Sequence, residues 1–118
     1  MRKLKTLLLA AAATAVACPA LALSSGFAVV GTDGSLVRGD GVANVTRNGQ
    51  GSYTVEFVHT VKSCAFTATT GLTGSVGDPP NGLVTVAGAH DDPKGVYVAT
   101  FDGTGNAADM SFHLNVRC

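Results

Sequence analysis

Short runs rich in Val, Thr, Phe and Tyr alternate with glycine-containing turns along most of the chain after residue 26. These residue types favour β-strands, because β-branched and aromatic side chains fit a pleated surface. Dipeptides that tolerate the positive φ of hairpin turns separate the runs, as in Asp33-Gly34, Asn48-Gly49, Asn81-Gly82 and Asp102-Gly103. The pattern predicts eight strands, over 27–30, 35–38, 42–47, 52–61, 64–70, 83–88, 96–101 and 111–118.

Alternation within the longer runs predicts which side chains face a core. In the run 52–61 we expect one buried face, made of Tyr53, Val55, Phe57, His59 and Val61. In the last run the expected inward residues are Phe112, Leu114, Val116 and Cys118, with His113, Asn115 and Arg117 facing outward. Eight short strands joined mostly by tight turns favour an all-β, antiparallel β-sandwich, with a small closed β-meander barrel as the alternative.

The first 22 residues have the pattern of a bacterial-type export signal. Arg2, Lys3 and Lys5 are followed by an apolar stretch over 7–16 and by the small-x-small cleavage site at 20–22. The mature chain is therefore expected to be one domain over 23–118, secreted or periplasmic. The alternative is a lipoprotein anchored at Cys18, although Ala15 stands where such boxes usually carry Leu and Pro19 follows the cysteine directly.

The charge and hydropathy of the mature chain restrict the classes of partner that we expect it to bind. Without Arg2, Lys3 and Lys5, five basic residues remain against eight acidic ones, which argues against nucleic acid or an anionic membrane surface. After cleavage we expect no integral membrane segment, because no other apolar run is long enough to cross a bilayer. Few charges protect the edges of the expected sheets, so the sequence also predicts self-association as a homo-oligomer.

Signal cleavage would leave two cysteines, Cys64 and Cys118, in an oxidising compartment. A disulfide between them is the expected outcome, and two free thiols or an intermolecular bridge are the alternatives. Cys64 shares a predicted face with Phe66 and Ala68, and Cys118 with Leu114 and Val116. Because both cysteines point inward, we expect the bridge to span the core between two sheets.

No motif specifies a reaction. Asp102, Asp109 and His113 form a candidate polar cluster, with Ser111 or Thr104 as a conceivable nucleophile, but the sequence lacks a Gly-x-Ser-x-Gly elbow. His59, His90 and His113 have no ligand spacing, and the pair at 91–92 matches no calcium loop, so no metal and no cofactor is expected. Without Trp, and with Tyr53 and Tyr97 in patterns that suit a core or a cross-strand pair, platforms for sugar stacking look scarce.

The segments 27–34, 53–64 and 95–118 resemble a group of uncharacterised exported bacterial β-rich domains that end in the pattern FD…AD…FHLxVxC. The resemblance implies a complete domain ending at its own cysteine, and it transfers no activity and no site residue. We therefore expect an exported, non-enzymatic module with a binding, surface or structural role, whose partner is an unidentified protein or envelope component. The alternative is a small secreted hydrolase or hydrolase inhibitor. The longest irregular stretch, 71–82, is a candidate surface for that role.

The predicted cleavage site gives a first test. Removal of 22 of the 118 residues leaves 96, beginning at Leu23. N-terminal sequencing of the protein recovered from a secreting bacterial host should therefore start with Leu-Ser-Ser-Gly. A blocked, lipid-modified N-terminus at Cys18 would contradict this and support the lipoprotein alternative.

Overall fold

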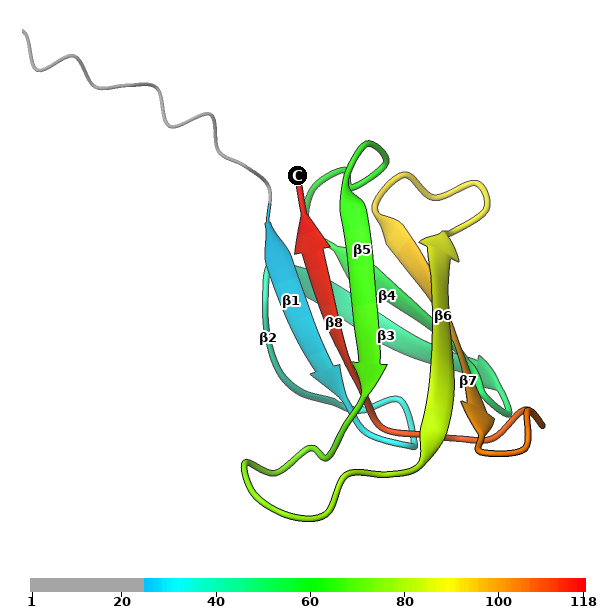
Figure 1. Cartoon of the computed structure of the whole chain (residues 1–118). Helices are drawn as coiled ribbons and strands as arrows, with labels where there is room; N and C mark the ends of the chain where they lie inside the picture. The colour runs from blue at the N-terminus through cyan, green and yellow to red at the C-terminus, as the bar shows by residue number, and fades with distance from the viewer. Residues whose placement is uncertain (1–24) are drawn as a thin grey trace, which may run out of the picture.

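The computed structural model describes residues 25–118, and the predicted export signal with Cys18 lies outside them. This part of the chain forms two four-stranded antiparallel sheets packed face to face, with no helix and no closed barrel, which confirms the predicted β-sandwich (Figure 1). The eight strands are β1 (Gly26–Val30), β2 (Leu36–Asp40), β3 (Val42–Gly49), β4 (Ser52–Phe57), β5 (Ala65–Thr70), β6 (Gly82–Gly88), β7 (Gly95–Asp102) and β8 (Phe112–Arg117).

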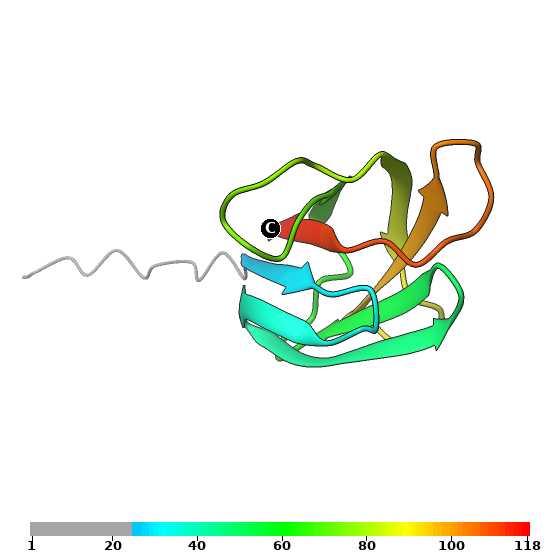
Figure 2. The ribbon, with the colours of Figure 1, turned by 90° about the horizontal axis from the view of Figure 1, so that it is seen from below.

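The strand order defines the two layers. One sheet, here the A sheet, has the order β2-β1-β8-β5, and the other, the B sheet, has the order β3-β4-β7-β6. Gly41 alone separates β2 from β3, so the chain changes sheets there within one residue, at a positive φ of 72°. The loop 71–81 carries the chain from β5 to β6, and the segment 103–111 carries it from β7 back to β8. Figure 2 shows the two layers from below, with these connections at their ends.

The core lies between the sheets and depends on their central strands. The side chains that are fully buried come from β1 and β8 on one side and from β4 and β7 on the other, together with Val61. Tyr53 and Phe112 meet edge to face across the two layers, with ring centroids 5.2 Å apart. Burial of each large apolar side chain contributes about 1.5–3 kcal/mol. On the edge strands the inward residues are only partly buried, namely Val42, Val45, Phe66, Ala68, Val84 and Val86.

The strand expected over 52–61 is shorter than the sequence pattern suggested. β4 ends at Phe57, whose N–H donates to the carbonyl of Lys94. Beyond it, Val58 N–H bonds to Gly41 and Val61 N–H bonds to Pro93, so the backbone leaves the ladder with β7 and packs against neighbouring turns. Val61 is still buried, and His59 is half-buried with its ring stacked on Phe57, the centroids 6.4 Å apart, so His59 lies at the margin of the core rather than within it.

Cys64 and Cys118 form the predicted disulfide, but the bridge does not span the core. Ala65 pairs with Arg117 in the ladder between β5 and β8, so the cysteines occupy the next position along two neighbouring strands of the A sheet. Inward orientation alone does not distinguish a partner in the facing sheet from one on the adjacent strand. The expected link between the sheets was therefore wrong, and the bridge instead closes one end of the β5–β8 ladder.

Loss of this bridge should weaken the domain. Cys118→Ser is expected to lower the free energy of unfolding by about 4 kcal/mol, the chain-entropy value for a closed loop of this length, and to let the end of β8 fray. Urea unfolding measures the loss, and the Cys64→Ser/Cys118→Ser double variant should match it because both proteins lack the same bond. The oxidised protein should also weigh about 2 Da less than its reduced form, since two hydrogens are lost. Equal stability of all three proteins would contradict a stabilising bridge.

Candidate binding face on the A sheet

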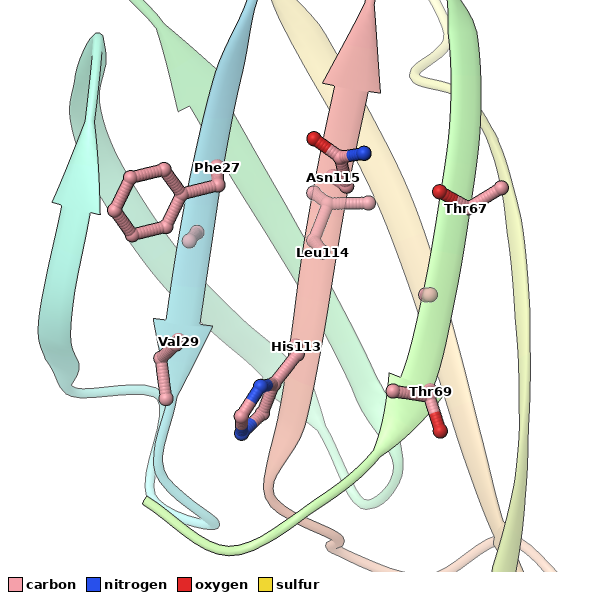
Figure 3. A pocket seen from close by; sticks show the side chains of 9 residues that line it. Phe27, Val29, Thr67, Thr69, His113, Leu114 and Asn115 are labelled. Carbon is pink, nitrogen blue, oxygen red and sulfur yellow. The ribbon is translucent and has the colours of Figure 1, made fainter. Parts of the chain in front are cut away.

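A hollow of about 420 Å³ lies on the outer face of the A sheet, over β8 and between β1 and β5 (Figure 3). We call it the A-sheet hollow. Its volume falls within the roughly 300–1,000 Å³ typical of small-molecule sites. The outward side chains around it are Phe27 and Val29 from β1, His113 and Asn115 from β8, and Thr67 and Thr69 from β5.

Strand register arranges these six side chains in two rows. Asn115 is opposite Phe27 on one side and Thr67 on the other, which makes a row of an aromatic ring, an amide and a hydroxyl. His113 is likewise opposite Val29 and Thr69. Neighbouring strands are roughly 4.8 Å apart, so each row presents groups at a regular spacing.

The first row, formed by Phe27, Asn115 and Thr67, has hydrogen-bonding capacity that the protein does not use. Within residues 25–118 the side chains of Thr67 and Asn115 make no hydrogen bond to the protein, whereas Thr69 Oγ1 donates to the carbonyl of Thr70. Phe27 is 43% exposed. Figure 3 shows its ring nearly face-on and turned toward β2, so that the ring lies beside the hollow rather than over β8.

The loop 71–81 contacts the A sheet beside one end of the hollow, at His113. Three side chains bind backbone carbonyls of this loop. Ser111 Oγ, just before β8, donates to Gly71 O at 2.6 Å, and Arg38 Nη1 on β2 donates to Thr73 O at 2.7 Å. His113 Nε2 lies 2.7 Å from Leu72 O, and because a carbonyl only accepts, this nitrogen carries the proton. The predicted candidate surface is therefore a loop fastened to the sheet beside the hollow.

The structure does not gather the candidate cluster of Asp102, Asp109 and His113 into one site. Asp102 Oδ1 accepts three hydrogen bonds within its own turn, from the N–H and hydroxyl of Thr104 and from the N–H of Asn106. The hydrogen bond from the Thr104 side chain is the main cause that lowers the pKa of Asp102. His113 lines the A-sheet hollow, and the hydroxyl of Ser111 donates its hydrogen bond to Gly71 O in the loop 71–81.

Asp109 is the centre of a separate polar network that joins β3, β4 and the segment 103–111. Its carboxylate accepts two bonds at 3.1 Å from Arg47 Nε, one at 2.8 Å from Arg47 Nη2 and one at 2.8 Å from Gly51 N–H. The Tyr53 hydroxyl lies 3.2 Å from Asp109 Oδ1 and 2.7 Å from Thr32 O. Bonding to Arg47 lowers the pKa of Asp109, and burial raises the pKa of Tyr53 to about 12.

Several other polar residues make local hydrogen bonds that stabilise turns. Asp92 Oδ1 accepts the N–H of Lys94, and its hydrogen bond with Glu56 raises the pKa of Glu56. His59 contacts the carbonyl of the next residue, Thr60. Among residues 25–118, no three side chains of His, Cys, Asp or Glu lie close enough together to hold a metal ion.

No protein-family profile matches this sequence, and neither a curated protein nor a solved structure matches it. Nor does the described chain contain a helix of the length and apolarity needed to cross a bilayer. The candidate site is therefore argued from its own geometry. Its residues Phe27, Thr67 and Asn115 were not predicted as a site, although alternation in the last strand did place Asn115 outward.

The Tyr53 network should be visible at alkaline pH. Because the pKa of Tyr53 in the folded protein is about 12 and the ordinary value is 10.0, the network contributes stability in full below pH 10 and loses it as pH rises toward 12. Tyr53→Phe should flatten this part of the stability curve, measured by urea unfolding at successive pH values. Tyr97→Phe is the matched control, since Tyr97 is exposed on the B sheet, and it should keep the wild-type loss. Identical alkaline curves for wild type and Tyr53→Phe would contradict the assignment.

Proposed function

We propose that this protein is an exported, non-enzymatic binding module whose ligand contacts the A-sheet hollow. The observation that carries the proposal is the row of an exposed aromatic ring and two unpaired polar side chains, formed by Phe27, Asn115 and Thr67. A ligand that supplies partners to this amide and hydroxyl gains hydrogen bonds and breaks none within the protein. The export signal pattern and the disulfide support a secreted or periplasmic location.

The outer face of the B sheet offers a contrast that favours the A sheet. There two pairs of polar side chains satisfy one another: Asn48 Nδ2 donates to Thr54 Oγ1 at 2.9 Å, and Ser52 Oγ to Tyr97 Oη at 3.2 Å. Among the strand threonines and asparagines that the structure describes on that face, only Thr85 on β6 keeps an unpaired hydroxyl. A ligand on that face would have to replace existing bonds, which lowers its net gain. Within the described strands the two faces are similar in secondary structure, but only on the A sheet do two unpaired polar side chains, Thr67 and Asn115, stand opposite each other.

A hydrolase has less support from the same residues. The hollow is lined by hydroxyl, amide, imidazole and apolar groups, with no carboxylate among them, and the aspartates of the candidate cluster are bound in separate networks. General acid and base catalysis needs such groups within hydrogen-bond reach of one reacting atom. We therefore keep binding as the proposed activity, with a second copy of the chain as one further class of partner, since β6 is an uncharged edge strand.

The proposal predicts that a bulky charge in the hollow abolishes binding while the same change on the other sheet does not. Thr67→Arg on β5 and Thr85→Arg on β6 are matched, because both threonines are exposed on edge strands, one in each sheet. Mature wild-type protein used as bait on envelope extract and culture fluid should retain a ligand that Thr85→Arg also retains and Thr67→Arg loses.

Light scattering on the three proteins keeps this result separate from self-association. If Thr67→Arg loses the ligand but keeps the wild-type oligomeric state, the hollow itself is the binding site. Equal capture by all three proteins, or capture by none, would refute binding at this face.

A further inference from the structure

We infer that the A-sheet hollow binds a neutral saccharide, with one sugar ring stacked on Phe27 beside the hollow and the hydroxyls of the adjoining ring bonded to Asn115 and Thr67. The inference rests on the proposed function and adds the chemical class of the ligand. It departs from the expectation that sugar platforms are scarce, which considered only Trp and the two tyrosines and left out the exposed ring of Phe27.

The absence of charge from the lining selects a neutral ligand. None of the nine lining residues is Asp, Glu, Lys or Arg. Three charged side chains of the A sheet lie around the lining and outside it: Asp40 and Arg38 on β2, opposite Phe27 and Val29, and Arg117, two residues after Asn115 on the same face of β8. The guanidinium of Arg38 is also bonded to the loop. Within the lining a charged ligand would lose hydration without meeting a partner charge, which is costly.

The first row matches the two kinds of surface of a pyranose ring. Such a ring has a face of C–H groups and an edge of hydroxyls. The exposed ring of Phe27 offers an apolar, electron-rich face for the C–H groups. The amide of Asn115 donates and accepts at once, as a hydroxyl does, and the Thr67 hydroxyl extends this capacity one strand further.

Other neutral ligands fit less well. A peptide that adds a strand needs unpaired backbone groups, which the A sheet offers only at its edge strands β2 and β5, whereas β8 beneath the hollow is paired on both sides. An acyl chain would leave the amide of Asn115 and the hydroxyl of Thr67 buried without partners. The spacing of roughly 4.8 Å between strands gives the row a length suited to one or two sugar rings.

Calorimetric titration of the mature protein tests the class of ligand. The neutral probes are cellobiose, maltose and N,N′-diacetylchitobiose, and the comparison probes are digalacturonic acid and laurate. We expect at least one neutral disaccharide to bind, and Asn115→Ala and Phe27→Ala each to weaken it about tenfold, through a lost hydrogen bond and lost stacking. Tyr97→Ala is the matched control, because Tyr97 is 38% exposed on the B sheet, and it should leave the affinity unchanged.

The outcomes separate this inference from the proposed function. Failure of all three neutral disaccharides to bind, equal affinity in Phe27→Ala and Tyr97→Ala, or tighter binding of digalacturonic acid or laurate would overturn the saccharide assignment. A ligand captured by wild type and lost by Thr67→Arg would still support the binding module. Thermal unfolding of each variant identifies loss of fold, and Asn115→Asp then serves as a second variant of nearly the same shape, expected to weaken binding by placing a charge in a neutral hollow.

Discussion

Strand β8 has two faces with different roles, and both depend on its pairing with β1 and β5. Its inward residues Phe112, Leu114 and Val116 are buried in the core, and its outward residues His113 and Asn115 lie in the A-sheet hollow. Because successive side chains point to opposite faces, a slip of one residue in either ladder would exchange the two sets. Correct register therefore fixes the core and the candidate site together.

The segment 103–111 brings β8 to this position after β7 ends in the other sheet. Thr100, the one buried polar residue of the described chain, binds this segment with its hydroxyl, which donates to Ala108 O at 2.6 Å. The carboxylate of Asp109 binds the segment to β3 and β4 through Arg47 and Tyr53. These polar contacts hold the crossover against the B sheet and so help to determine where β8 enters the A sheet.

Local sequence signals were sufficient to predict the strands and the disulfide pair. They were insufficient to predict which strands are neighbours and where the disulfide lies between them. Alternation identified Tyr53, Val55 and Phe57 as inward residues, because one buried face imposes a period of two. It overextended the same strand, since hydrogen bonds from Val58 and Val61 to distant turns have no local signature. The row of Phe27, Asn115 and Thr67 was missed because it depends on strand order, which brings residues 27, 67 and 115 together from three separate parts of the chain.

Because the disulfide lies within the A sheet, it joins two strands that line the candidate site. A bridge across the core would not do so. The bond follows the last pair of the β5–β8 ladder, at one end of two of the three strands that line the hollow. At the other end His113 and Ser111 bind the carbonyls of Leu72 and Gly71. The two strands are thus held at both ends, which limits the conformational entropy that Asn115 and Thr67 lose when a ligand binds. A shallow, uncharged hollow makes few contacts, so its affinity depends strongly on keeping this cost small.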